Sequence, residues 1–224
     1  IRIANLVIQK LDEGLLKDAS EEQYNWLLGQ ALFFRAYYHY EIVRTWGTIP
    51  YNDLATVGDE FKMERHWSYE KDGRVYTDVQ AVLERCVEDL EEAELLLPDE
   101  WPDESVNFGR VTSLAAKGLK SKALLFSASP LFNEQANGIL QYDSELLIRC
   151  AEAAMETIEA TLAKNAGSSS RLVNNVNGDG LTNFSDIQRM FAVTDATVPS
   201  TAEVLFQKMN IWQNQGASMW DLRL

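Results

Sequence analysis

Residues 27–51 hold the most restrictive feature of the sequence, a long apolar segment that reaches its first proline only near its end. Apolar side chains recur there at spacings of three and four, on one helical face: Leu27, Ala31, Phe34, Tyr38 and Ile42. Further large side chains fall on a second face: Leu28, Phe33, Tyr37 and Tyr40. A helix that is apolar around most of its circumference packs on several sides. We therefore expect a central helix, ended by Gly47 and Pro50.

Amphipathic helices are predicted on both sides of this central helix. Their expected ranges are residues 1–16 before it and residues 72 or 74 to 97, 113–129 and 144–164 after it. Ser20 and Thr112 are typical N-cap residues, and Gln23 completes a capping box with Ser20. The residues between 48 and 67 contain several turn formers, so a loop is expected there.

Side chains on two of these helices can be assigned to faces. The helix 144–164 has an apolar stripe, expected to be buried, at Leu147, Ala151, Ala154, Ile158 and Leu162. The helix ending at residue 97 has an acidic run, interpreted as a solvated face, at Glu84, Glu88, Glu91 and Glu92. Cys86 and Cys150 lie among apolar positions of these helices. Two reduced core cysteines are therefore expected, and a disulfide is the alternative.

Beyond about residue 165 the pattern becomes rich in loops. A short helix is expected near residues 185–191, and the only plausible strand lies at residues 201–209. We expect one domain over residues 1–224, with a helical core over about 1–165 and a loop-rich part over about 166–224. The repeated helix pairs predict an all-α fold. The nearest template is a tetratricopeptide-like superhelix of helix pairs, with long interrupting loops and little strand.

Composition limits the class of partner. The chain carries 34 acidic and 20 basic residues, a net charge of -14, which argues against a nucleic-acid partner. No apolar run is long enough to predict a transmembrane helix. The opening segment IRIANLVIQKL is typical of a helix inside a domain and lacks a signal peptide or lipid-anchor cysteine. We therefore expect the native gene to encode more than this chain.

Four segments resemble signatures of the SusD/RagB family. They are residues 33–38 (FFRAYY) with 46–50 (WGTIP), the helix 79–98, residues 109–112 (GRVT) with the helix after them, and residues 127–133 (SASPLFN). The four occur in the family's order and spacing. The resemblance covers nearly the whole chain and thins after about Lys164. Members of this family are cell-surface, glycan-binding lipoproteins of Bacteroidetes-type bacteria.

The resemblance implies a SusD-like helical fold and capture of oligo- or polysaccharide without covalent chemistry. It also implies delivery of the glycan to a SusC-like TonB-dependent transporter. The expected location is the cell surface at the outer membrane, held by a lipid anchor absent from this chain. No enzyme activity and no cofactor are expected. Two alternatives stay open: a tetratricopeptide-type scaffold that binds peptides and an α-helical glycoside hydrolase. The long loops and the GRVT and SPLFN segments argue against the peptide-binding scaffold.

Three residues of the chain are candidates for a buried polar or a catalytic role. A nucleophile–base set needs histidine or an equivalent base, and the chain has only His39 and His66. His39 lies in the central helix, where a satisfied core or groove role is expected, and His66 is expected to be exposed. Arg35 lies on the same helix among few polar positions, so its guanidinium is expected to be buried and paired. With 34 acids, spacing alone neither proposes nor excludes a carboxylate pair, and no catalytic residue is predicted.

One segment has the spacing of an EF-hand calcium loop. Its positions are Asn175, Asn177, Asp179, Gly180 and Asp186. Only two carboxylates are present among them, which weakens affinity for a hard dication. The family resemblance makes the segment an ordinary loop. No metal site is therefore predicted, and calcium binding remains the alternative.

Tryptophan side chains are candidates for sugar contact, because an aromatic face packs well against the apolar face of a sugar ring. Trp26 and Trp46 are expected in the core. The remaining four lie in predicted loops or just past the strand: Trp67, Trp101, Trp212 and Trp220. Amide side chains surround Trp212. We predict Trp212, Trp220 and Asn214 as glycan-binding residues; for each tryptophan the alternative is that it covers an edge of the core.

Overall fold

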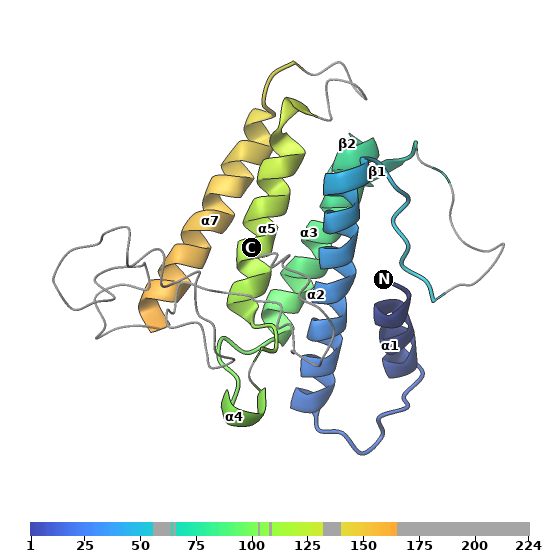
Figure 1. Ribbon diagram of the computed structural model, residues 1–224, viewed down its shortest axis with the longest axis vertical. Helices are drawn as coiled ribbons and strands as arrows, with labels where there is room; N and C mark the ends of the chain where they lie inside the picture. Colours follow the sequence, from blue (N-terminus) through green and yellow to red (C-terminus); the bar gives the residue numbers. More distant parts are fainter. Residues whose placement is uncertain (56–63, 65, 103, 108, 132–139, 165–224) are drawn as a thin grey trace, which may run out of the picture. The chain divides into compact units, whose positions relative to one another are not determined.

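A computed structural model describes residues 1–55, 64, 66–102, 104–107, 109–131 and 140–164 (Figure 1). The chain divides into two compact units. The first comprises Ile1–Glu100 with Val111–Glu156, and the second comprises Trp101–Arg110 with Thr157–Leu224. The sections below concern mainly the first unit.

The described residues form helices and one hairpin. In chain order the elements are α1 (Arg2–Asp12), α2 (Glu21–Trp46), β1 (Ser68–Lys71), β2 (Arg74–Thr77), α3 (Asp78–Leu96), α4 (Glu104–Asn107), α5 (Ser113–Ala128) and α7 (Ser144–Lys164). This confirms the predicted all-α fold. Among the described helices, none is long and apolar enough to span a membrane.

Helix α2 is the central element that the sequence predicts. Ser20 and Gln23 form its capping box, with Gln23 N–H donating to Ser20 Oγ over 3.2 Å and Ser20 N–H donating to Gln23 Oε1 over 3.1 Å. Gly47 follows its last turn with a φ of 78°, a conformation that favours glycine. At Gly29 an added Cβ would lie 2.9 Å from Cγ of Leu97. The absence of a side chain there lets α2 approach the end of α3 closely.

Helix α3 lies between α2 and α5 (Figure 1) and contributes more buried apolar side chains than any other described element. Its fully buried apolar side chains include Val82, Leu83, Cys86 and Leu90. Cys86 is reduced and buried, and Cys150 is reduced and half-buried. The predicted reduced state of both cysteines is thus confirmed. The predicted core location is confirmed for Cys86, whereas Cys150 lies at the edge of the core.

The hairpin β1–β2 contradicts two predictions. A helix was expected from residue 72 or 74, but α3 begins at Asp78, and residues 201–209 were expected to be the only strand. Strands β1 and β2 pair antiparallel, with Tyr69 opposite Tyr76. Asp72 and Gly73 join them with φ values of 54° and 78°. Two successive residues with positive φ form the turn that matches the twist of a two-stranded hairpin.

Two further expectations about helices are wrong. Helix α1 ends at Asp12 rather than near residue 16, because Gly14 adopts a φ of 72°. In α7 the buried positions are Leu146, Ala153 and Thr157, whereas Ala151 and Ile158 of the predicted stripe are exposed. Contacts of Arg149 and Cys150 with neighbouring elements turn α7 away from the predicted face.

The predictions for the C-terminal part of the chain lie outside the described residues. They concern the short helix at 185–191, the strand at 201–209 and the calcium-type loop from Asn175 to Asp186. The predicted glycan-binding residues Trp212, Trp220 and Asn214 also lie there.

Candidate functional site

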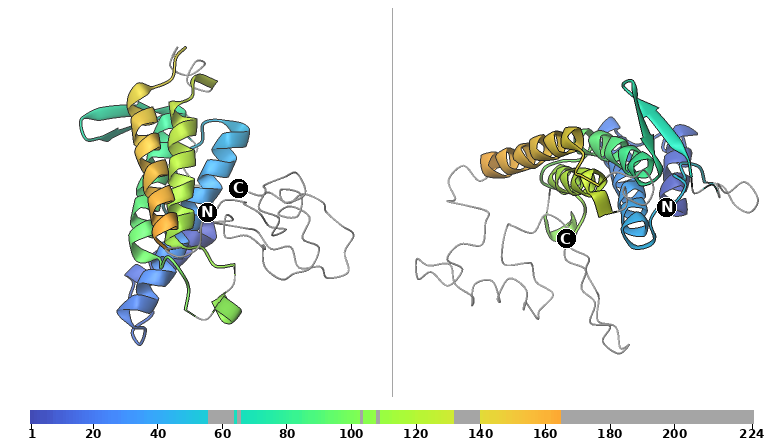
Figure 2. Two further views of the ribbon diagram at one scale, coloured as in Figure 1. Left: turned by 90° about the vertical axis from the view of Figure 1, so that its left-hand side faces the viewer. Right: turned by 90° about the horizontal axis from the view of Figure 1, so that it is seen from above.

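Several elements of the first unit meet at one end, which we call the hairpin end. Helix α2 ends there, the hairpin β1–β2 lies there, α5 ends there and α7 begins there (Figures 1 and 2). The segment 47–55 also leaves α2 at this end. Two networks of polar side chains hold these elements together.

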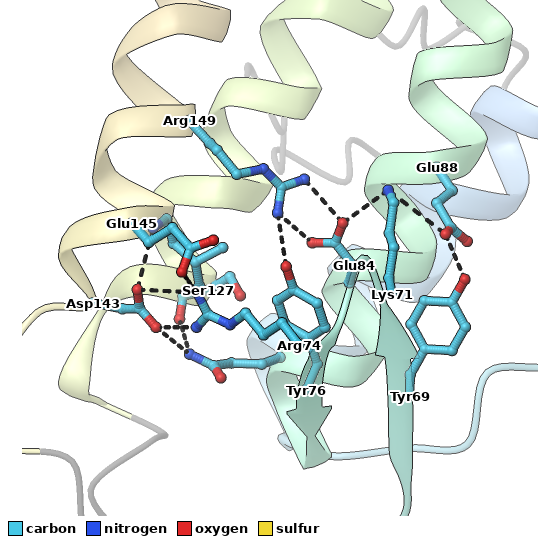
Figure 3. Close-up of polar contacts among 12 residues, drawn as sticks. Tyr69, Lys71, Arg74, Tyr76, Glu84, Glu88, Ser127, Asp143, Glu145 and Arg149 are labelled. Carbon is cyan, nitrogen blue, oxygen red and sulfur yellow. Dashed lines mark hydrogen bonds and ion pairs between the residues drawn. The ribbon is translucent and has the colours of Figure 1, made fainter.

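Glu84 is the centre of the first network (Figure 3). Its carboxylate accepts two hydrogen bonds from Arg149 of α7, over 2.8 and 2.9 Å, and one from Lys71 of β1 over 3.0 Å. Glu84 is only 2% exposed. Burial alone would raise the pKa of Glu84, but the hydrogen bonds from Arg149 and Lys71 outweigh it and lower this pKa. The prediction that Glu84 belongs to a solvated face is therefore wrong.

Asp143, at the start of α7, also belongs to the first network (Figure 3). It pairs with Arg74 of β2 and accepts a hydrogen bond from the Gln80 amide over 3.4 Å. It also accepts the backbone N–H of Leu146 over 3.2 Å, which caps α7. Burial opposes ionisation, but the bonds from Arg74 and the Leu146 N–H lower the pKa of Asp143. The hairpin thus binds α7 through two buried or half-buried carboxylates.

Arg35 and Asp89 form the second network, between α2 and α3. Two guanidinium nitrogens of Arg35 each donate to a carboxylate oxygen of Asp89 over 2.6 Å, and both side chains are buried. The hydroxyl of Tyr51 donates to the same carboxylate. The predicted burial and pairing of Arg35 are confirmed. The contact with Tyr51 also ties the segment 47–55 to the core.

His39 attaches the same segment to α2. Its Nε2 accepts the backbone N–H of Asn52 over 3.0 Å, so its Nδ1 carries the proton and donates to the carbonyl of Arg35 over 2.8 Å. Asn5 of α1 donates to the carbonyls of Asn52 and Leu54 over 2.8 and 2.9 Å. His39 is fully buried, which confirms its predicted role as a satisfied core histidine. His66 is exposed, as predicted.

The buried position of His39 predicts a pH dependence of stability. Desolvation lowers the pKa of His39 from 6.5 to about 4. The unfolded chain therefore binds this proton at a higher pH than the folded protein. The stability contribution is fully present above pH 6.5, and it is lost as the pH falls toward 4. Between pH 7 and pH 5 this group should remove about 2 kcal/mol of unfolding free energy.

Urea unfolding of His39→Gln at the two pH values measures this contribution. The difference in stability between pH 7 and pH 5 should shrink by about 2 kcal/mol relative to the wild type. The exposed His66→Gln variant is the matched control. An unchanged difference in His39→Gln would show that burial does not lower the pKa of His39 in the folded protein.

Arg85 connects the two networks. Its guanidinium lies over the ring of Tyr51 at 5.1 Å and over the ring of Tyr69 at 5.2 Å from the ring centroids. It also lies 3.6 Å from Asp53 and 3.4 Å from Glu88. Arg85 therefore holds the segment 47–55 and strand β1 against α3. The sequence pattern did not identify Arg85, because most of its partners lie in the segment 47–55 and in strand β1, far from it in the sequence.

The described tryptophans differ from expectation. Trp46 was expected in the core but is 79% exposed at the end of α2. Trp101 lies in a loop as predicted, yet it is buried, with Arg110 over its ring at 5.1 Å. Trp67 is half-buried, and its indole N–H donates to the carbonyl of Ile49 over 3.1 Å. Among the described tryptophans, Trp46 is thus the exposed one, and it lies at the hairpin end.

The buried carboxylates of the two networks are engaged in ion pairs. A general acid of the glycosidase type needs a carboxyl group whose pKa is raised. In Glu84 the pKa is lowered, and Asp89 is held by Arg35 and Tyr51. Within the part of the chain that the structure describes, no three His, Cys, Asp or Glu side chains are grouped to hold a metal ion. The two networks therefore hold surface segments to the core, and they engage the carboxylates of Glu84 and Asp89 in ion pairs.

These features define a class of protein: an all-α scaffold of packed helices that uses buried ion pairs to fix a hairpin and a loop at one end. The model of the SusD-like family, described as starch-binding and associating with the outer membrane, matches residues 1–125. The chain belongs to the SusD-like family.

Two solved structures, both of the protein BT4246, show the same fold. The selenomethionine form of the protein BT4246 matches with a TM-score of 0.62 and 19% identity. The match covers 94% of this chain and 38% of the BT4246 chain. A further BT4246 structure matches with a TM-score of 0.60 and 22% identity, over 91% of this chain and 34% of its own. A SusD-like protein (BF3747) from Bacteroides fragilis has a TM-score of 0.48 and 20% identity, over 70% and 25% of the two chains.

This chain therefore spans about a quarter to two fifths of the length of the solved structures it matches. No curated protein sequence matches it significantly.

Proposed function

We propose that this protein captures oligo- or polysaccharide at the outer membrane and delivers it to a SusC-like TonB-dependent transporter. The observation that carries the proposal is the family match over residues 1–125, whose description is starch-binding and associating with the outer membrane. A starch-type α-glucan is accordingly the first ligand to test. The two networks at the hairpin end fit this function, because they supply a rigid frame on which binding loops can be held.

Calorimetry with the full-length protein tests glycan capture. Maltooligosaccharides of increasing length are titrated first, and other neutral glycans follow. The proposal predicts saturable binding to at least one glycan class. Absence of binding to every glycan, with the protein folded by circular dichroism, would overturn the proposal.

Delivery and location are tested in cells. A SusC-like transporter should co-purify with this protein from solubilised outer membranes, and protease added to intact cells should cleave this protein. A protein that is protected in intact cells and purifies alone would contradict both parts. A peptide adaptor would bind peptides and no glycan, and a glycoside hydrolase would shorten the glycan that it binds.

The binding residues remain part of the proposal. We place the glycan on Trp212 and Trp220, with Asn214 as a polar partner, because stacking supplies contact area and amides supply directional hydrogen bonds. Trp212→Ala should weaken glycan binding by about 1–3 kcal/mol, the order of stacking on an aromatic platform, with the melting temperature nearly unchanged. Calorimetry and thermal unfolding measure the two effects.

Trp46→Ala is the matched control for Trp212, since Trp46 is highly exposed on the described part of the chain. Unchanged affinity is expected for this control. If Trp46→Ala weakens binding and Trp212→Ala does not, the glycan binds at the hairpin end, and the assignment to Trp212 is wrong.

A further inference from the structure

His39 ties the segment 47–55 to helix α2 through both nitrogens of its imidazole ring. Nε2 accepts the backbone N–H of Asn52 over 3.0 Å, and Nδ1 donates to the carbonyl of Arg35 over 2.8 Å. The ring stacks on that of Tyr51, with the ring centroids 4.2 Å apart and the two planes inclined by 16°. His39 is fully buried. A second proton could therefore enter only at Nε2, the atom that faces the donor of Asn52.

Side chains from the neighbouring helices hold the same segment. Asn5 of α1 donates to two carbonyls of the segment over 2.8 and 2.9 Å, and the hydroxyl of Tyr51 donates to Asp89 of α3. Helices α2 and α3 also pack directly against each other. Loss of one side-chain contact can therefore open the segment while the two helices stay packed. Among these contacts, that of His39 is made by an acceptor nitrogen that becomes a donor on protonation.

We propose that protonation of His39 releases the segment 47–55 from α2 and opens this part of the hairpin end in mildly acidic solution, while α2 and α3 stay packed. The imidazolium carries an N–H on both nitrogens, so Nε2 would point its proton at the N–H of Asn52, and the hydrogen bond between them is lost. Detachment of the segment lets water reach Nε2 and solvate the charge. Each opening takes up one proton from the solvent, so acid favours the open form.

The surroundings of His39 oppose its protonation in the closed form. Burial is the main cause, and it lowers the pKa of His39 to about 4. The hydrogen bond to the Arg35 carbonyl and the charge of Asp53 in the segment raise this pKa, whereas the charges of the Arg35 guanidinium and of the Ile1 amino group on α1 lower it. Both ring nitrogens bond to backbone groups, so the added charge gains no carboxylate partner among the described residues. Ionisable groups of α3 lie around the stacked ring of Tyr51: Arg85, Cys86 and Asp89.

The size of the response follows from the two protonation equilibria. When the segment is open, the ring is hydrated and has its ordinary pKa of 6.5, compared with about 4 in the closed form. The equilibrium constant for opening should therefore rise about 20-fold between pH 7 and pH 5. The rise starts as the pH falls below 6.5 and levels off below about pH 4.

Hydrogen exchange of the full-length protein tests the proposal. Fragment-resolved mass spectrometry follows the Asn52 amide and, for comparison, core amides of α3 in residues 79–90, and each rate is divided by the intrinsic rate at that pH. The corrected rate of Asn52 should rise about 20-fold between pH 7 and pH 5. At both pH values, low urea concentrations should change it much less than the core rates, because local opening exposes little surface. The proposal goes beyond glycan capture and does not rest on it, since the measurement needs no glycan.

Two variants separate the switch from a merely structural contact. His39→Gln keeps an acceptor and a donor on the side chain but takes up no proton, so the ratio of corrected rates between pH 5 and pH 7 should fall to about one. Asn5→Ala is the matched control, because it removes a different contact of the segment. In Asn5→Ala the exchange of Asn52 should be faster at both pH values, and the ratio of about 20 should remain.

Three results would overturn the proposal. The first is a wild-type ratio near one, and the second is a ratio of about 20 that persists in His39→Gln. The third is an equal urea dependence of Asn52 and the core amides, which would show that the segment opens only when the whole protein unfolds. The first and the third are measured on the wild type, so they decide the question even if His39→Gln does not fold.

Discussion

Replacement of Arg35 by Ala should lower the free energy of unfolding by about 3–5 kcal/mol, the range for breaking a buried ion pair. The change removes both hydrogen bonds to Asp89 and leaves that buried carboxylate without its cation. It also loosens Tyr51, which donates to the same carboxylate. Urea unfolding followed by circular dichroism measures the loss.

Arg44→Ala is the matched control, because Arg44 lies on the same helix and pairs with Glu41 at the surface. It should cost no more than about 1 kcal/mol. A double variant, Arg35→Met with Asp89→Leu, should recover part of the lost stability, since it leaves no unpaired buried charge. A loss below about 0.5 kcal/mol in Arg35→Ala, typical of surface sites, would contradict the buried pair.

Replacement of Glu84 by Gln should lower the unfolding free energy by about 2–3 kcal/mol. The expected loss is smaller than for Arg35, because Lys71 and Arg149 are partly exposed and can be hydrated after the change. The lowered pKa of Glu84 also predicts in which direction the stability of the protein changes with pH. Its contribution is present at neutral pH, and it is lost as the pH falls below the ordinary value of 4.5 and through the folded pKa.

Labelling of Cys150 measures the local effect of the same change. Glu84→Gln removes the carboxylate that anchors Arg149, so α7 should open more often, and the half-buried Cys150 should react faster with a maleimide. The buried Cys86 should stay protected. Glu92→Gln, an exposed position on the same helix, is the control. Equal labelling of Cys150 in the wild type and Glu84→Gln would show that α7 does not depend on this network.

The helices were predictable from local signals. The capping box at Ser20 and the cap at Thr112 are properties of neighbouring residues, and the structure has both. The helix α2 itself was predictable from its apolar periodicity, but Leu27 and Tyr38 of the first predicted face are exposed. Burial of Arg35 was predictable too, because its helix has few polar positions. Its partner Asp89 was not, since 54 residues separate the two.

The errors arise where distant segments decide the structure. The hairpin was missed because its strands have only four residues each and run directly into α3, although the Asp72–Gly73 pair within an alternating segment is a hairpin signal. Glu84 was placed on the surface because its partners, Lys71 and Arg149, come from the hairpin and from α7. Trp46 was assigned to the core because it ends an apolar helix. The predicted glycan-binding residues lie outside the described part and stay predictions.

Capture of a glycan without its cleavage is the central claim. The most direct measurement incubates the full-length protein with the best-binding glycan from calorimetry, recovers the complex and determines the chain length of the bound glycan by mass spectrometry. The account predicts that the protein retains the glycan and that its length distribution equals that of the starting material after prolonged incubation. A bound glycan that becomes shorter with time would make the protein a hydrolase and contradict the account.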